Sequence, residues 1–327
     1  MVWYRAMTTL LMLPPQTATT REWAARVATA LPELTVVIAE DEAQAAREIV
    51  RAEAAFGTPS PALLRQAGRL RWLQAPQAAP PAGYYHDDLI QHPVVVTNFR
   101  EIYNDHIGAH IMAFVLAFAR GLHHYLPLQL RREWRPAPSD TGVVHLPEAT
   151  ALIVGVGGIG SEAARLAEAF GMRVIGIDAR RREAPPGVSK LDGPDALDAL
   201  LPEADFVILT VPHTPETQGF MHRARFQRMK RSAFFINIGR GLTTRLDDLV
   251  AALRAGEIAG AALDVFEQEP LPADHPLWTT PNVLITPHTA GYGPYLDDRR
   301  CEILLDNCRR FLAGHPLRNV VDKSRWF

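Results

Sequence analysis

"ALIVGVGGIGSEAARLAEAFGMRVIGIDARRR" (residues 151–182) places three glycines between an apolar run and an alanine-rich helical pattern, and a second apolar run then ends on an acid. Gly155, Gly157 and Gly160 fit the pattern G-x-G-x-x-G. The pattern alone is a weak signal, because a glycine-rich turn also serves simple chain reversal. Here it follows a predicted strand, opens a predicted helix and belongs to a complete βαβ unit. The stretch therefore predicts a dinucleotide-binding turn.

Each glycine has its own role in such a turn. Gly155 permits the tight turn, Gly157 lets the pyrophosphate approach the backbone, and Gly160 lets the helix pack on the strand. The N–H groups at the helix start, where Gly158 and Ile159 stand, then face the phosphates.

The acid that ends the second strand bears on the choice of cofactor. Asp178 lies 18 residues after Gly160, where a carboxylate accepts hydrogen bonds from both ribose hydroxyls. Its charge repels a 2′-phosphate, so we predict NAD rather than NADP. NADP stays possible through Arg180, or through Arg181 or Arg182, because an arginine here can reach a 2′-phosphate.

The whole chain has the size and composition of a globular protein with two domains. It has 327 residues, of which 47% are apolar and 21% charged. At about 150 residues per domain, this length predicts two domains. Its 34 basic and 36 acidic residues give no electrostatic footprint for nucleic acid.

The targeting signals and the cysteines bear on location. No apolar run reaches about 18 residues, so no membrane span is expected. The first residues resemble no secretory leader, and we interpret Thr8 to Leu13 as a first strand. Cys301 and Cys308 lie about 10 Å apart along a predicted helix, too far for a disulfide. The expected location is the reducing cytoplasm.

From Ala151 onward, short β-rich runs alternate with helical patterns, which predicts a parallel sheet wrapped by helices. The runs are apolar nearly throughout, as expected for strands covered on both faces. They are ALIVGV, RVIGID, DFVILTV, AFFINIG, GAALDVF and NVLITPH. We therefore predict an α/β fold with a doubly wound parallel sheet of the Rossmann type.

The first hundred residues repeat this alternation in a smaller α/β layer, through LLML, TVVIAE, LRWLQA and PVVVTN. A long helical pattern over residues 106–134 links the halves, and a helix from about Leu296 to Leu312 returns the chain to the first domain. We predict a substrate domain of residues 1–108 and 296–327, and a dinucleotide-binding domain of residues 109–295.

Polar side chains follow three of the later strands. Arg240 follows AFFINIG, Asp264 and Glu269 follow GAAL, and His288 follows NVLITP. Ligands of open α/β sheets bind beyond the carboxyl ends of the strands, so these residues are candidates for a site. Taken singly, each has an ordinary explanation at the surface or in packing.

Together, these residues match the needs of hydride transfer to a 2-oxo acid. The carbonyl oxygen gains negative charge, which calls for a proton donor and a fixed cation. His288 fits the donor, and Arg240 fits the cation because a guanidinium grips a carboxylate with two parallel hydrogen bonds. Glu269 is the candidate that orients the imidazole and favours its protonated form. Asp264 could contact the cofactor or cap a helix. No metal is expected.

The glycine-rich stretch and the segments that carry Arg240, Asp264, Glu269 and His288, in this order along the chain, resemble those of the D-isomer-specific 2-hydroxyacid dehydrogenases. The similarity extends over LLPEADFVILTVPHTPETQGF, MKRSAFFINIGRG and HPLWTTPNVLITPHTAG. It implies a catalytic trio of Arg240, Glu269 and His288, with Asp264 near the nicotinamide. It also implies a flavodoxin-like substrate domain, a hinged two-domain subunit and a homodimer through the cofactor domain.

The resemblance also assigns the lining of the cofactor cleft and the loop that binds the substrate. Val211 and Pro212 line the cleft, and Ile238 is a further cofactor-binding candidate. Backbone N–H groups of a small loop hold the substrate carboxylate in the family, and Ala78 and Ala79 stand in the corresponding stretch.

The chain departs from the family pattern at two places. Pro80 and Pro81 lack N–H groups, so the substrate loop is stiffer and has fewer donors. The family's usual Val-Ala-Glu in the linking helix is matched to Gly108-Ala109-His110, where we interpret His110 as a packing or hinge residue.

The leading hypothesis is an NAD(H)-dependent enzyme that interconverts a small to medium 2-oxo acid and a D-2-hydroxy acid. Glyoxylate, hydroxypyruvate and phenylpyruvate are all candidates. Formate oxidation is a lesser alternative, since those relatives carry glutamine at the position of Glu269. The alternative from another class is an NAD-sensing dimeric scaffold like the carboxy-terminal-binding corepressors.

Overall fold

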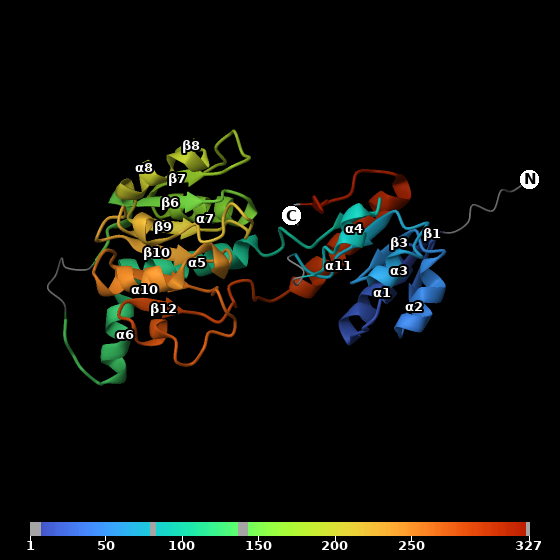
Figure 1. The fold of residues 1–327 in the computed structure, drawn as a ribbon, viewed down its shortest axis with the longest axis horizontal. Helices are drawn as coiled ribbons and strands as arrows, with labels where there is room; N and C mark the ends of the chain where they lie inside the picture. The colour runs from blue at the N-terminus through green and yellow to red at the C-terminus, as the bar shows by residue number, and fades with distance from the viewer. Residues whose placement is uncertain (1–7, 79–82, 137–142, 325–327) are drawn as a thin grey trace, which may run out of the picture. The chain divides into compact units, whose positions relative to one another are not determined.

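The chain divides into two compact units in the computed structural model, which describes residues 8–78, 83–136 and 143–324 (Figure 1). Unit 1 comprises Met1–Ile102 and Pro294–Phe327, and unit 2 comprises Tyr103–Gly293. The sequence-based boundaries lie between residues 108 and 109 and between residues 295 and 296.

Unit 2 is built on a seven-stranded sheet in the order β12-β11-β10-β9-β6-β7-β8, with every pair parallel. If β6 is counted as strand 1 and the sheet is followed from β8 to β11, the order is 3-2-1-4-5-6, that of dinucleotide-binding folds; β12 is one further strand at the edge. The strands are β6 (Thr150–Val154), β7 (Arg173–Ile177), β8 (Lys190–Asp192), β9 (Phe206–Leu209), β10 (Phe234–Asn237), β11 (Gly260–Leu263) and β12 (Val283–Ile285). The predicted Rossmann sheet is confirmed, and its strand order reverses between β6 and β9.

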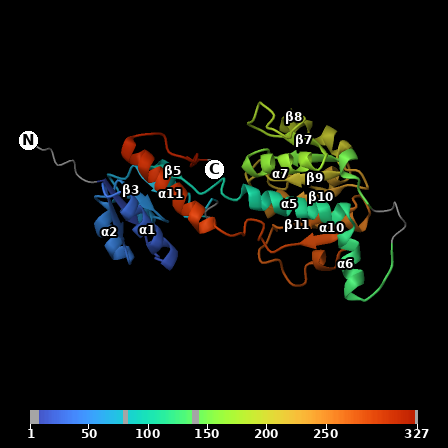
Figure 2. The ribbon, with the colours of Figure 1, turned by 180° about the vertical axis from the view of Figure 1, so that it is seen from behind.

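Helices cover both faces of this sheet, as Figures 1 and 2 show from opposite sides. Side chains alternate across a strand, so Ala151 and Ile153 of β6 enter one core while Leu152 and Val154 enter the other. The first core includes side chains of α5 (Asn104–Ala119) and α7 (Gly158–Ala169). The second includes side chains of α8 (Leu197–Leu200), α9 (Arg223–Phe226) and α10 (Leu246–Arg254).

The long helical pattern over residues 106–134 forms two helices rather than one. The first, α5, ends at Ala119, and α6 (Leu122–Leu130) continues at an angle of 75°. Gly121 lies at the break with φ of 67°, a left-handed conformation that glycine adopts without strain. The 106–134 pattern therefore predicts the helices correctly but not the corner between them.

No single helix in the described parts of the chain is long and apolar enough to cross a membrane. By length and composition alone, the bent pair α5 and α6 meets that test together, and the apolar side chains of α5 belong to the core of unit 2.

Unit 1 is built on a five-stranded parallel sheet in the order β2-β1-β3-β4-β5. This is the flavodoxin-like order, and it confirms the predicted smaller α/β domain. The strands are β1 (Thr8–Met12), β2 (Leu34–Ile38), β3 (Ala54–Phe56), β4 (Trp72–Gln74) and β5 (Val95–Thr97).

The two faces of the unit 1 sheet carry different cores. One core packs Leu11 and Leu73 against α2 (Glu42–Ile49), α3 (Pro61–Leu64) and α4 (Asp87–Gln91). Trp23 of α1 (Ala18–Ala30) contacts Phe56 and Phe99 edge-on, with ring centroids 5.8 Å and 5.9 Å apart. Trp72 contacts Phe311 of α11 (Leu296–Ala313), so the last long helix returns to unit 1 as expected.

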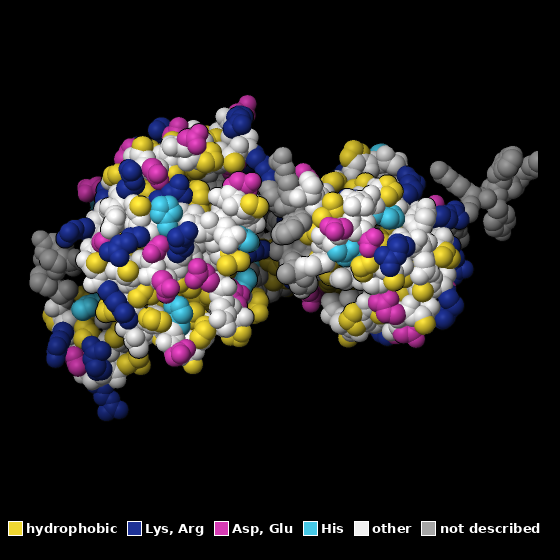
Figure 3. All heavy atoms as spheres, viewed as in Figure 1, with side chains coloured by type: hydrophobic (Ala, Val, Ile, Leu, Met, Phe, Trp, Pro, Cys, Tyr) yellow, Lys and Arg dark blue, Asp and Glu magenta, His cyan; other side chains and the backbone are white. Residues whose placement is uncertain are grey.

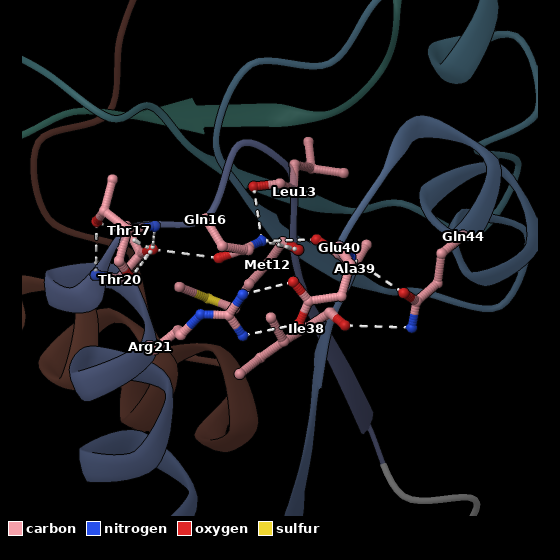
Figure 4. Close-up of polar contacts among 10 residues, drawn as sticks. All are labelled: Met12, Leu13, Gln16, Thr17, Thr20, Arg21, Ile38, Ala39, Glu40 and Gln44. Atoms are coloured by element: carbon pink, nitrogen blue, oxygen red, sulfur yellow. Dashed lines mark hydrogen bonds and ion pairs between the residues drawn. The ribbon is translucent and has the colours of Figure 1, made fainter.

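A polar cluster joins the ends of β1 and β2 in unit 1 (Figure 4). The side-chain amide of Gln16 donates to the carbonyl oxygens of Met12, Leu13 and Ala39, at 2.9–3.0 Å. Arg21 forms two hydrogen bonds with the carboxylate of Glu40 beside them. The Gln16 amide thus links backbone carbonyl groups at the ends of the two strands.

Charged side chains of both signs are interspersed over the face of the molecule shown in Figure 3. This agrees with the net charge of -2 that the sequence gives. The visible face carries no broad basic patch of the kind that tracks a phosphate backbone.

Candidate active site

The glycine-rich turn leaves β6 and enters α7, as the sequence predicts. Gly155 has φ of 94°, a conformation that suits glycine. A Cβ on Gly160 would lie 1.9 Å from the carbonyl oxygen of Gly155, so only glycine lets α7 start this close to the turn. A Cβ on Gly157 would meet no atom within 4 Å.

The start of α7 has the features of an anion site. Its N-cap is Gly157, and no side chain caps the first N–H groups of the helix. Gly158 lies close against the side chain of Asn104, since a Cβ there would be 2.6 Å from Nδ2. The N–H groups of Gly158, Ile159 and Gly160 thus stand at the positive end of the helix dipole, which favours a phosphate. The residues present fit a dinucleotide.

Asp178 ties the glycine-rich turn to the segment that follows β7. Its Oδ2 accepts a hydrogen bond from the N–H of Val156 at 3.0 Å. Its Oδ1 accepts from the N–H groups of Arg180 and Arg181, at 2.8 Å and 2.9 Å. A carboxylate oxygen can accept about two hydrogen bonds, so Oδ2 keeps acceptor capacity for a ribose hydroxyl, while Oδ1 is already occupied by two N–H groups.

The segment after β9 lies against the same turn. A Cβ on Gly155 would be 2.9 Å from Cγ1 of Val211, and a Cβ on Gly239 would be 2.5 Å from the carbonyl oxygen of Val211. The carbonyl of Pro212 accepts from the hydroxyl of Thr217 at 2.7 Å. Ile238 follows β10 directly and is buried. The structure therefore brings Val211 to the glycine-rich turn, where the sequence places the cofactor cleft.

Thr210 has a positioning role that the sequence analysis missed. Its hydroxyl donates to the carbonyl oxygens of Gly155 and Val154, the latter at 3.2 Å. It therefore joins the ends of the two strands between which the sheet order reverses.

His288 and Glu269 form a close pair. Nδ1 of His288 lies 2.6 Å from Oε2 of Glu269. The other carboxylate oxygen of Glu269 accepts from the N–H of Phe266 at 2.9 Å, which fixes the carboxylate. Because Nδ1 donates to Glu269, Nε2 is the ring nitrogen that remains to exchange a proton with a ligand. The His288 side chain is 50% exposed, which leaves it accessible.

Arg240 is held by the turn that follows β10. Its carbonyl oxygen accepts from the side chains of Asn237 and Thr243, at 3.1 Å and 2.6 Å. Its guanidinium donates to the carbonyl oxygen of Gly239 at 2.7 Å and keeps further N–H groups for a ligand. Burial lowers the pKa of Arg240, while the charge of Glu269 raises it.

Asn237 was not predicted from the sequence as a site residue. Its side chain is fully buried, with Oδ1 accepting from the N–H of Gly239. An asparagine at the end of an apolar strand is the only signal that could have identified it.

Asp264 holds the loop that carries His288. The N–H of His288 donates to the carbonyl oxygen of Asp264, and the N–H groups of Thr289 and Ala290 donate to its carboxylate, all at 2.9–3.0 Å. The hydroxyl of Thr286 donates to Oδ1 at 2.5 Å. Asp264 is 1% exposed, so it acts from within the protein.

The three loops that carry the trio lie together at the carboxyl ends of neighbouring strands, β10, β11 and β12. A Cβ on Gly241 would fall 1.8 Å from the carbonyl oxygen of Phe266, so the Arg240 turn packs directly on the segment that leads to Glu269. The hydrogen bond from Nδ1 of His288 to the carboxylate of Glu269 joins this segment to the third loop. The loops after β11 and β12 thus meet at the Glu269–His288 pair, and the Arg240 turn packs against the loop after β11.

The residues expected at the substrate carboxylate belong to unit 1. The carbonyl oxygen of Ala78 accepts from the side chain of Asn98 at 2.9 Å. Ala79, Pro80 and Pro81 lie outside the described residues. Within the described residues, no group of three or more histidine, cysteine, aspartate or glutamate side chains could hold a metal ion.

Comparison with known proteins extends this geometry. Residues 112–290 match the family model of the D-isomer specific 2-hydroxyacid dehydrogenase NAD binding domain. A glyoxylate reductase from Korarchaeum cryptofilum is 41% identical over 175 residues, which are 53% of this chain and 52% of that protein. A glyoxylate/hydroxypyruvate reductase A from Yersinia enterocolitica is 32% identical over 218 residues, 67% of each chain.

The overall fold is similar to that of solved structures. A D-isomer specific 2-hydroxyacid dehydrogenase from Xanthobacter autotrophicus, determined in complex with NADPH and MES, is 30% identical. The match has a TM-score of 0.83 and covers 98% of this chain and 100% of that one.

Proposed function

The chain belongs to the D-isomer specific 2-hydroxyacid dehydrogenase family, and from this premise we propose that it interconverts a small to medium 2-oxo acid and the corresponding D-2-hydroxy acid with a nicotinamide dinucleotide. Family membership makes it an oxidoreductase with an NAD-binding Rossmann domain. Glyoxylate and hydroxypyruvate are the first candidate substrates, because two similar proteins bear these names.

The observation that carries the proposal is the pair of His288 and Glu269 beside the Arg240 turn. The distance of 2.6 Å between Nδ1 and Oε2 fixes both the tautomer and the orientation of the imidazole. A pair of this kind serves general acid–base catalysis, and a nearby arginine adds the fixed cation that a developing alkoxide needs.

In the reducing direction, a bound dihydronicotinamide would be the source of the hydride that the carbonyl carbon of the 2-oxo acid accepts. Nε2 of His288 gives its proton to the carbonyl oxygen, and the C=O double bond becomes a C–OH group. Glu269 stabilises the ring while it is protonated. Arg240 holds the substrate carboxylate and polarises the carbonyl through its paired N–H groups. Oxidation runs through the same groups in reverse.

We place the cofactor along the glycine-rich turn. The N–H groups of Gly157, Gly158, Ile159 and Gly160 at the start of α7 would hold the pyrophosphate, and Gly155 shapes the turn. Asp178 would accept a hydrogen bond from the adenosine ribose. Val211, Pro212 and Ile238 line the cleft, and Asp264 acts on the nicotinamide side through the loop that it holds. Two observations support this assignment. No side chain caps the start of α7, and a Cβ built on Gly157 would meet no atom within 4 Å, so the space beside this glycine is open.

NADH is the cofactor that we propose, and NADPH is the alternative with its own support. The carboxylate of Asp178 stands where a 2′-phosphate would meet its negative charge. Against this, Arg180, Arg181 and Arg182 are exposed beside it, and three of the similar solved structures were determined with NADPH or NADP. The ratio of kcat/KM for the two cofactors decides between them.

We further propose that the N–H groups of Ala78 and Ala79 contribute to binding the substrate carboxylate. Asn98, which is 2% exposed, supports this loop through its hydrogen bond to the carbonyl of Ala78.

We also propose a homodimer through unit 2. An apolar row lies exposed along and beyond α6 at a spacing of four residues, which places its helical members on one face. It consists of Leu122, Leu126, Leu130 and Trp134, whose exposed fractions are 46%, 51%, 86% and 95%. Such a contiguous exposed row is typical of a protein–protein interface.

The test is the oxidation of NADH and of NADPH, each measured against glyoxylate, hydroxypyruvate and phenylpyruvate. We expect turnover with at least one of these acids, and faster turnover with NADH. Absence of turnover with both cofactors across the panel would overturn the proposed function.

A further inference from the structure

His110 stands apart from the proposed site in sequence but is connected to it in space. It lies in α5, and its Nε2 is 3.0 Å from the hydroxyl oxygen of Thr286, 176 residues further along the chain. Its ring packs edge-on against Phe114, with centroids 4.7 Å apart. The packing explains why an aromatic ring stands there, but it leaves the hydrogen bond to Thr286 unexplained.

The direction of this hydrogen bond follows from the partners of Thr286. A hydroxyl group has one proton to donate, and Thr286 donates it to the carboxylate of Asp264 at 2.5 Å. The hydroxyl oxygen therefore accepts from His110, and the proton of the neutral imidazole sits on Nε2. Burial lowers the pKa of His110, and the smaller effect of the Asp264 charge opposes it. The lowered pKa keeps the ring mainly neutral at neutral pH.

The chain of hydrogen bonds ends on the loop that carries the proposed catalytic histidine. The carboxylate of Asp264 accepts from the N–H groups of Thr289 and Ala290, and the backbone carbonyl oxygen of Asp264 accepts from the N–H of His288. His288 itself has φ of 54°, a left-handed conformation that costs a non-glycine residue free energy and persists only where its surroundings enforce it. The orientation of Asp264 is thus one of the conditions that place the imidazole on Glu269.

We propose that His110 is a positioning residue for His288, acting through Thr286 and Asp264. Because His110 donates to the hydroxyl oxygen of Thr286, the hydroxyl hydrogen of Thr286 stays directed at the carboxylate of Asp264. The carboxylate then stays oriented toward the N–H groups of Thr289 and Ala290, which follow His288 directly in the loop. The proposal rests on the proposed function, because it assigns His288 the role of proton donor.

The structure offers variants that separate the hydrogen bond from the packing. His110→Phe keeps a ring against Phe114 and removes the donor. His110→Gln restores a donor, because its Nε2 lies the same number of bonds from Cα as the imidazole Nε2. Thr286→Val removes the connecting hydroxyl with little change of shape.

His123→Phe is the matched control. His123 is also half-buried, it packs on Phe118 with centroids 5.0 Å apart, and burial likewise lowers its pKa. In the described structure it has no hydrogen bond to the loop that carries His288.

The first measurement is steady-state turnover together with NADH binding and thermal unfolding. Loss of one buried hydrogen bond is expected to lower kcat about three- to tenfold in His110→Phe and in Thr286→Val. The double variant that combines His110→Phe with Thr286→Val should have the same kcat as Thr286→Val alone, because both changes break the same series of hydrogen bonds. The dissociation constant for NADH and the Tm should stay near those of wild type, and His110→Gln should recover most of kcat.

The second measurement does not depend on turnover. Amide hydrogen exchange of residues 286–293 reports whether the loop is held, because protection is lost where local hydrogen bonds open. His110→Phe should exchange faster in this segment, while His110→Gln and His123→Phe should match wild type.

The outcomes are distinct for the two proposals. Unchanged kcat in His110→Phe, or a fall in kcat matched by weaker NADH binding and a lower Tm, would overturn the positioning role. So would unchanged exchange at residues 286–293. If wild type lacks turnover altogether, the proposed function fails, and the exchange experiment still decides whether His110 holds the loop.

Discussion

At the residue scale, the proposed chemistry depends on side chains whose backbones are fixed by buried neighbours. Arg240 is held by the amide of Asn237 and the hydroxyl of Thr243. His288 is held by Asp264. Polar groups that are buried and fully hydrogen-bonded specify one arrangement, so the reacting side chains need little reorganisation when a ligand binds.

The role of Arg240 is tested by a change that keeps its charge. Arg240→Lys should lower kcat/KM for the 2-oxo acid about a hundredfold, equivalent to about 2.7 kcal/mol, because an ammonium cannot form two parallel hydrogen bonds with a carboxylate. Steady-state kinetics provides the measurement. Arg254→Lys, on the exposed side of α10, is the control. Near-wild-type kinetics in Arg240→Lys would remove Arg240 from the substrate site.

At the element scale, the segments after β6, β7, β9, β10, β11 and β12 carry almost all of the proposed site. The sequence predicts this, because each of these strands is a short run, mostly apolar, that reaches a glycine or a polar residue within two positions of its end. The periodicity also predicts both parallel sheets and α11.

Other elements could not be predicted from the sequence, for physical reasons. Strands β3 and β8 have three residues each and contain no β-branched residue, so they lack the composition typical of a strand. The corner at Gly121 depends on one left-handed residue within an otherwise helical pattern. The supporting contacts of Asn237, Thr286 and His110 join segments distant in sequence, and only the folded sheet brings them together.

Two glycines of the turn after β6 should respond differently to alanine. Gly157→Ala should keep the Tm of wild type, since its Cβ meets no protein atom within 4 Å, yet weaken NADH binding about tenfold or more, because the methyl group stands where we place the pyrophosphate. Gly160→Ala should lower stability by about 1–3 kcal/mol, since its Cβ overlaps the carbonyl oxygen of Gly155.

Thermal unfolding and NADH titration of both variants provide the measurement. Gly68→Ala, where a Cβ also meets nothing within 4 Å and which lies in unit 1, is the control. Unchanged NADH binding in Gly157→Ala would contradict the proposed position of the cofactor.

The helix α6 should contribute to acid sensitivity through His123. Burial lowers the pKa of His123, with a smaller opposing effect from a hydrogen bond to the carbonyl of Ala117. As pH falls below the unfolded value of about 6.5, the unfolded chain takes up a proton that the folded side chain resists, so stability decreases.

His123→Phe should therefore lose less Tm than wild type between about pH 7.5 and about pH 5.5. Differential scanning calorimetry at several pH values measures this, with His315→Phe, at an exposed position, as the control. An identical pH dependence in His123→Phe and wild type would be evidence against the burial effect.

At the scale of the whole molecule, one chain forms two α/β units, each built on a parallel sheet with its own strand order. Unit 2 holds the proposed trio and the dinucleotide turn, and unit 1 holds the described part of the proposed substrate loop. The chain crosses between the units twice, near residues 102 and 294.

The proposed homodimer predicts that charge on the exposed row of α6 separates the subunits. The variant Leu126→Glu with Leu130→Glu should change the sedimenting species from two chains to one, because carboxylates cannot be buried unpaired in an apolar interface. Sedimentation velocity measures this. Val50→Glu, at an exposed apolar position of unit 1, should leave the mass unchanged. A wild-type protein that sediments as one chain would contradict the dimer.

The most direct test of the central claim is the chirality of the product formed from hydroxypyruvate and NADH or NADPH. Glyoxylate is unsuitable for this test because its product is achiral. The account predicts D-glycerate from wild type, and a large loss of its formation in His288→Gln, in which the proton donor is removed. Formation of L-glycerate, or an undiminished rate in His288→Gln, would contradict it.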